Sequence, residues 1–169
     1  VLLAVVHTWP LASAPGTLSR NDNADTVLHE WTLAWVAHEA PRSLTRIYDA
    51  PIFRPEQRTL AYSEALLLQS ALAAPLFSLG ASPVLTYSVV LLAGMTLSAW
   101  AMCLLLVRWT GSWTAGIVAG TAFAINAHAL TRLPHLQAQH TEFFPLALFA
   151  FDAVLRRPGW RSAGALALA

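Results

Sequence analysis

Two aspartates, Asp22 and Asp25, follow the first apolar segment of the chain and directly precede a stretch with helical spacing, "TVLHEWTLAWVAHEA". A carboxylate at this position commonly caps the helix by accepting backbone N–H bonds, which contributes about 1 kcal/mol. It can also act as a general base toward an acceptor hydroxyl. The cap is the more common role for either aspartate alone, but two acids within four residues shift the balance toward the second use. We therefore take Asp25 and Asp22 as candidate catalytic residues. The run "NDNAD" lacks the glycine and the further ligands of a calcium loop.

A third acid, Glu64, begins an apolar run in "RTLAYSEALL". Its charge suits the N-terminus of a helix, and this is one explanation for its position. The alternative is that Glu64 faces a polar cavity beside Arg54 or Arg58, since guanidinium groups bind phosphate in a bidentate manner. We keep Glu64 as a candidate substrate-binding residue.

A second polar segment, "TRLPHLQAQHTEFFPL", lies between two apolar runs. A short hairpin between membrane helices needs far fewer polar groups, which favours a polar site at the membrane surface. Arg132, His135 and His140 are its candidate substrate-binding residues. His135 and His140 are five residues apart and do not share one face of a regular helix, so the usual i, i+4 metal-ligand spacing is not met. The identity of any metal is left open.

The elements that must position these residues are membrane helices. The chain has 169 residues, of which 56% are hydrophobic and 11% are charged, whereas soluble domains carry about 25% charged residues. The net charge of +1 gives no electrostatic case for binding nucleic acid. One cysteine, Cys103, permits no disulfide within the chain.

The hydrophobic pattern predicts an all-α polytopic transmembrane bundle, and we expect residues 1–169 to be the N-terminal part of one membrane domain in a longer protein. The segments expected along the chain are the end of a first transmembrane helix (1–6), an outer loop (7–82) with surface helices near 26–40 and 64–80, transmembrane helices at 83–107, 112–130 and 143–155, and the start of a further one (160–169). In the 83–107 segment, the small residues that would let a neighbouring helix approach closely are Ala93, Gly94, Ser98 and Ala99. The 112–130 segment contains Gly116, Gly120 and Asn126.

Arginines indicate which side of the membrane each loop faces. Arg108 and the cluster after residue 155 are expected on the cytoplasmic side, which places the loop 131–142 outside. If residues 65–80 crossed the membrane, the long polar segment would face the opposite side from that loop. Gln69, Pro75 and the short length of this run favour a surface helix instead, and both polar segments then share the outer face.

Three stretches carry a resemblance to a known family: "NDNADTVLHEWTLAW", "PEQRTLAYSE" and "RLPHLQAQHTEFFPL". Together with a long outer loop after the first apolar segment, they resemble the GT-C class of integral membrane glycosyltransferases. This class includes protein O-mannosyltransferases, aminoarabinose transferases and oligosaccharyltransferases. The resemblance implies a GT-C-like fold whose long first extracytoplasmic loop bears juxtamembrane helices, in a bacterial inner membrane.

The resemblance also implies a chemistry. The donor would be a polyprenyl-phosphate or polyprenyl-diphosphate sugar, and the acceptor a glycan, a lipid or a protein. Asp25, or failing it Asp22, matches the acid of the first outer loop. The second outer loop of such enzymes often carries another acid, but His140 and Glu142 are the nearest residues here. This departure leaves open a requirement for a divalent cation such as Mg²⁺ or Mn²⁺.

A non-catalytic polytopic protein is the alternative function, either a transporter or a flippase-like subunit for cell-envelope polymers. Transporters usually place their critical polar groups near the middle of the bilayer. The sequence of the 83–107 segment predicts no such group, and the long outer loop favours the transferase.

Overall fold

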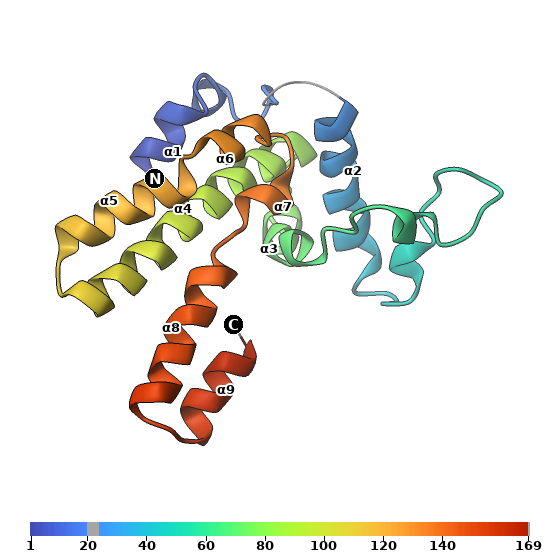
Figure 1. The fold of residues 1–169 in the computed structure, drawn as a ribbon. Helices are drawn as coiled ribbons and strands as arrows, with labels where there is room; N and C mark the ends of the chain where they lie inside the picture. The colour runs from blue at the N-terminus through green and yellow to red at the C-terminus, as the bar shows by residue number, and fades with distance from the viewer. Residues whose placement is uncertain (20–23, 169) are drawn as a thin grey trace. The chain divides into compact units, whose positions relative to one another are not determined.

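The computed structural model describes residues 1–19 and 24–168, and Asp22 therefore lies outside the described residues. The described part is helical and contains no strand (Figure 1), which confirms the all-α prediction there. Its helices in chain order are α1 (Leu2–His7), η1 (Leu11–Ser13), α2 (Ala24–Glu39), η2 (Arg46–Tyr48), η3 (Thr59–Tyr62), α3 (Leu67–Ser78), α4 (Pro83–Thr110), α5 (Trp113–Ala124), α6 (Ala127–Thr131), α7 (Leu136–Gln139), α8 (Phe143–Arg156) and α9 (Trp160–Leu168).

Among the described residues, α4 is the one helix long and apolar enough to cross a membrane. Its 28 residues span about 42 Å, against a hydrocarbon thickness of about 30 Å. The other predicted spans correspond to shorter helices, since α5 has 12 residues and α8 has 14. The α5 helix ends early because Asn126 caps α6, its side chain accepting a hydrogen bond from the Ala129 N–H at 3.0 Å. A polytopic bundle therefore stays a prediction.

The chain divides into two compact units. Unit 1 comprises residues Val1–His7, Leu92–Leu133 and Ala138–Ala169. Unit 2 comprises Thr8–Leu91 and Pro134–Gln137. The predicted outer loop thus lies almost entirely in unit 2, together with a short piece of the second polar segment.

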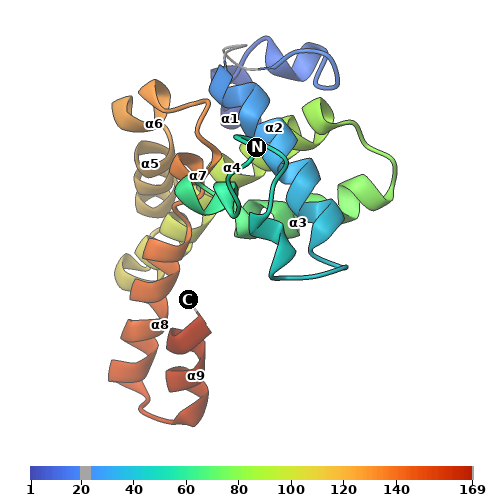
Figure 2. The ribbon, with the colours of Figure 1, turned by 90° about the vertical axis from the view of Figure 1, so that its right-hand side faces the viewer.

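In unit 2, α2 packs against α3, and Figures 1 and 2 show the two helices together. The small core of this unit consists of Val36, Ile47, Ala50 and Leu60. Trp35 packs against this core, and its indole N–H donates a hydrogen bond to the main-chain oxygen of Ile47 at 2.8 Å. The predicted surface helix near 26–40 corresponds to α2, which ends just before Pro41.

In α3, two polar side chains are buried while three of its leucines are exposed. Gln69 and Ser70 are buried, whereas Leu68 and Leu72 are 41% and 40% exposed. A helix on the surface of a water-soluble protein has the opposite arrangement, with an apolar stripe facing the core. The α3 helix therefore carries exposed apolar side chains of the kind that contact lipid or another protein. Its 12 residues span about 18 Å, which is less than the thickness of the hydrocarbon core.

In unit 1, glycines of α5 allow it to lie directly against α4. A Cβ atom added at Gly120 would be 2.3 Å from the main-chain oxygen of Ala99, and one added at Gly116 would be 2.8 Å from that of Cys103. The two glycines are four residues apart and so face the same neighbour. The close approach expected from the small residues is confirmed at this contact. In the same unit, α8 and α9 form a helical hairpin (Figure 2).

Candidate functional site

The first turns of α2 supply two of the functional side chains. Asp25 lies in the first turn of the helix, where its negative charge complements the helix dipole. His29 follows four residues later and therefore lies on the same face. The Asp25 side chain is 55% exposed, whereas that of His29 is 4% exposed. One face of α2 thus carries an accessible acid above a buried imidazole.

The orientation of His29 is set by a main-chain oxygen. Its Nδ1 lies 3.0 Å from the oxygen of Pro134, and the Tyr87 hydroxyl donates to the same oxygen at 2.9 Å. A carbonyl oxygen can only accept, so Nδ1 carries the hydrogen and donates it. In the neutral ring the lone pair is then on Nε2.

The Nε2 atom of His29 lies 3.6 Å from Oε2 of Glu64, a distance too long for a direct hydrogen bond. Burial lowers the pKa of His29 below its ordinary value of 6.5, against the opposing effects of the Pro134 hydrogen bond and the Glu64 charge. The ring is therefore mainly neutral at pH 7. An imidazole nitrogen and a carboxylate oxygen at this separation can each accept one hydrogen bond, which suits a group with two donor hydrogens, such as a pair of adjacent hydroxyls.

His135 completes the arrangement. Its Nε2 lies 3.8 Å from Oδ2 of Asp25, and its ring packs edge-on against that of His29, with 5.8 Å between the ring centroids. We name Asp25, His29, Glu64 and His135 the acid–histidine cluster. Glu64 is 53% exposed, so both carboxylates reach the surface of unit 2 while His29 forms the floor.

The predicted site residues divide between the two units. Asp25, Glu64 and His135 come together in unit 2 around His29. Arg132 and His140 belong to unit 1, where Arg132 is exposed and His140 is buried. Asp22 lies outside the described residues, and its predicted role is untested.

His140 takes part in a buried polar network in unit 1. Its Nδ1 lies 2.9 Å from Oε1 of Glu142, and the Ser98 hydroxyl lies 3.1 Å from the other carboxylate oxygen of Glu142. The His140 ring fills the space beside Gly94, where an added Cβ would be 2.7 Å from its Cδ2. Ser98 lies near the middle of α4, so a carboxylate and an imidazole contact that helix halfway along its length. The sequence of this segment predicted no such polar group.

Sequence reasoning missed His29 and Tyr87 as site residues. The four-residue spacing from Asp25 to His29 was the available signal, because it places both side chains on one helical face. Tyr87 lies inside a long apolar run and gave no separate signal. The oxygen that both contact belongs to Pro134, which is 105 residues from His29 in the sequence.

The described residues contain no group of three or more histidine, cysteine, aspartate or glutamate side chains placed to hold a metal ion. A requirement for Mg²⁺ or Mn²⁺, which the sequence left open, is not decided by this observation. No protein-family model, curated protein or solved structure matches this chain.

Proposed function

We propose that this protein is a membrane glycosyltransferase that moves a sugar from a polyprenyl-phosphate or polyprenyl-diphosphate donor to an acceptor hydroxyl at the extracytoplasmic face of the membrane. The observation that carries the proposal is the acid–histidine cluster, in which three residues singled out from the sequence meet on one surface. The resemblance to the GT-C class supplies the class of reaction.

Asp25 is the general base of the proposed reaction. The acceptor oxygen attacks the anomeric carbon of the donor sugar, the bond from that carbon to the phosphate oxygen breaks, and the polyprenyl phosphate leaves with the electron pair. The acceptor proton passes to the Asp25 carboxylate, which is accessible and lies 3.8 Å from His135. His135 orients this carboxylate, while Glu64 and His29 each accept a hydrogen bond from one of two adjacent hydroxyls of the sugar or of the acceptor.

An apolar groove between α2 and α3 suits the prenyl chain of the donor. Its volume is about 430 Å³, and its lining includes Val36, Ile47, Leu67 and Ala71. Val36 is seven residues beyond His29 on α2, a rise of about 10 Å along the helix axis. A lipid phosphate near the cluster could therefore extend its first isoprene units into the groove.

The membrane part of the proposal rests on α4 and on apolar side chains that face outward. Beside the leucines of α3, α5 exposes Ile117 and Val118 at 58% and 64%, and α8 exposes Phe144 at 61%. Large apolar side chains that are exposed in number mark a surface that contacts lipid or another protein. We propose that α5 and α8 are also in the membrane, as parts of the polytopic bundle.

The test of the proposal is Asp25→Asn in the full chain, assayed for transfer of a radiolabelled sugar from a polyprenyl-phosphate donor. Loss of the base is expected to lower the rate at least about 100-fold. Asp49→Asn is the matched control, because Asp49 is also an exposed acid of unit 2 and lies outside the cluster. If Asp25→Asn transferred sugar at the rate of the unmodified chain, Asp25 would not be the base.

The transporter alternative is favoured by one observation, the buried contact of Glu142 and His140 with Ser98 midway along α4. Ionisable groups at membrane depth often mark a substrate or proton path. Glu142→Gln separates the two functions in proteoliposomes. If Glu142→Gln abolished substrate flux while Asp25→Asn had no effect on sugar transfer, the protein would be a transporter and not a transferase.

A further inference from the structure

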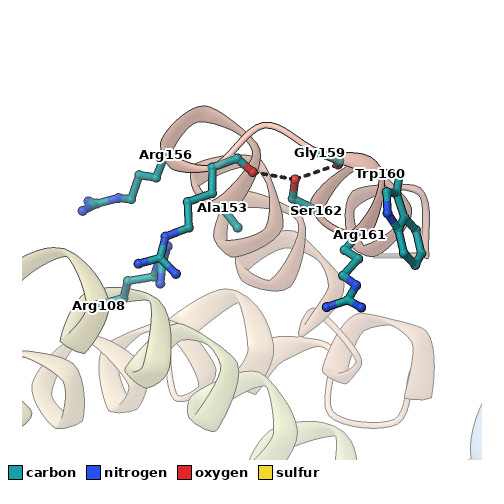
Figure 3. Close-up of a pocket in the computed structure, with 8 residues that line it drawn as sticks. Arg108, Ala153, Arg156, Gly159, Trp160, Arg161 and Ser162 are labelled. Carbon is teal, nitrogen blue, oxygen red and sulfur yellow. Dashed lines mark hydrogen bonds between the residues drawn. The ribbon is translucent and has the colours of Figure 1, made fainter.

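Four arginines gather around one cavity of unit 1, between the end of α4 and the α8–α9 hairpin. The cavity has a volume of about 630 Å³ and is lined by Arg108, Arg156, Arg157 and Arg161, with Trp160 and Ser162 beside them. Figure 3 shows Arg108 and Arg161 approaching it from different elements. This cavity has no part in the proposed transferase reaction.

The charges around the cavity are only partly balanced. Asp152 accepts hydrogen bonds from Nε of Arg108 at 2.5 Å and from Nε of Arg156 at 2.9 Å. Arg157 and Arg161 make no ion pair with any described residue. Four arginines against one aspartate leave a formal excess of three positive charges, which favours an anionic ligand.

Arg157 and Arg161 lie on either side of the turn between α8 and α9, which hydrogen bonds from Ser162 hold in place. The Ser162 hydroxyl lies 2.9 Å from the main-chain oxygens of both Arg157 and Gly159. Figure 3 shows the hydrogen bond from Ser162 to Gly159 as a dashed line. The Arg161 guanidinium lies over the Trp160 ring, 5.2 Å from its centroid. A stacked guanidinium keeps the N–H groups along its edge available, and this edge matches the oxygens of a phosphate.

Trp160 lines the cavity and is 80% exposed, which indicates the source of the phosphate. Leu155, two residues after the lining residue Ala153 in α8, is 67% exposed. Tryptophan beside arginine at the end of an apolar helix is typical of the boundary between hydrocarbon and water. A free phosphate ion would gain nothing from these side chains, whereas a phospholipid could place its acyl chains against them.

We propose that this cavity binds the phosphate of an acidic phospholipid headgroup. Arg157 and Arg161 bind the phosphate oxygens, and Trp160 contacts the glycerol backbone and the upper acyl chains. Arg108 and Arg156, held by Asp152, supply the surrounding positive field. The proposal is independent of sugar transfer, since none of these residues belongs to the acid–histidine cluster.

The test is binding of a short-chain phosphatidylglycerol to the full chain in a neutral detergent, with the matching phosphatidylcholine and inorganic phosphate as separate ligands. The unmodified chain is expected to bind phosphatidylglycerol and neither of the others. The double variant Arg157→Gln/Arg161→Gln is expected to bind it about thirtyfold more weakly, from the contribution of each arginine to binding of acidic lipid. Arg42→Gln, which removes an exposed arginine of unit 2, is the matched control and should bind as the unmodified chain does.

Three results would overturn the proposal: equal binding of phosphatidylcholine, an unchanged affinity in the double variant, or competition by inorganic phosphate at millimolar concentration, which would identify a site for the free ion. If the double variant failed to fold, a photoactivatable phosphatidylglycerol would decide the matter on the unmodified chain. Crosslinks are expected within residues 153–162, and crosslinks confined to other segments would exclude the cavity.

Discussion

Replacing Gly120 with alanine tests whether the direct contact of α5 with α4 holds unit 1 together. The added Cβ would lie 2.3 Å from the Ala99 oxygen, whereas ordinary contact begins at 3.4 Å, so one helix must move by about 1.1 Å. Because the obstacle is main chain, no side-chain rotation can relieve it. Overpacking of this kind costs about 1–3 kcal/mol, and it outweighs the gain of up to about 1 kcal/mol from exchanging glycine for alanine in a helix.

Gly164→Ala is the matched control. Gly164 lies within α9, and an added Cβ there would meet no atom within 4 Å. The same substitution should therefore stabilise the helix by up to about 1 kcal/mol. Both variants exchange glycine for alanine in a helix, so the gain from helix propensity is the same in each. The difference between their free energies of unfolding therefore measures the overpacking at Gly120.

The free energy of unfolding in mixed micelles titrated with dodecyl sulfate gives the magnitude. The reactivity of Cys103 toward a maleimide gives the location, because this thiol is buried and its Sγ would lie 3.1 Å from a Cβ at Gly116. Gly120→Ala should lower the free energy of unfolding and accelerate labelling of Cys103. An unchanged free energy together with unchanged labelling would show that α5 does not rest on α4 in this way.

Three further substitutions test other parts of the structure. Burial lowers the pKa of His29, which faces Glu64 and His135, below its unfolded value of about 6.5. The folded state therefore loses stability as the pH falls below that value, because the buried ring must then be protonated or the chain unfold. The melting temperature should decline from pH 8 to pH 5, and His29→Gln should reduce that decline. Glu142→Leu should cost about 3–5 kcal/mol in chemical denaturation, because it removes one member of the buried pair that Glu142 forms with His140. Trp35→Phe should cost about 1 kcal/mol by the same measurement, since it removes one hydrogen bond to main chain.

Helices marked by clear start and stop signals could be predicted from the sequence. The prediction of a helix at 26–40 matches α2, which follows from its apolar spacing, the acid in its first turn and Pro41 after its end. The 83–107 prediction matches the start of α4, which continues to Thr110 and ends before Gly111, whose φ of 72° requires the left-handed region. The 112–130 prediction missed the interruption of the helix, because apolar composition hides a cap made by the single residue Asn126.

The candidate site was predictable in part for similar reasons. Asp25, Glu64 and His135 stood out as polar residues next to apolar segments, and the structure brings them together. His29 did not stand out, because its orientation depends on a main-chain oxygen, which leaves no trace in residue type. His140 can be buried because Gly94 has no side chain and leaves room for the imidazole ring. The sequence pattern does not show which residue occupies that space.

The oxygen that orients His29 has a consequence for mutational tolerance. Every amino acid carries a main-chain carbonyl, so no substitution at position 134 can delete the group that fixes the tautomer. A substitution there can only change how firmly the carbonyl is directed, and the restricted φ of proline makes that direction firm. Substitutions at Pro134 should therefore change the orientation of the His29 ring only gradually. In contrast, Tyr87→Phe would remove the hydroxyl and with it the hydrogen bond to the Pro134 oxygen.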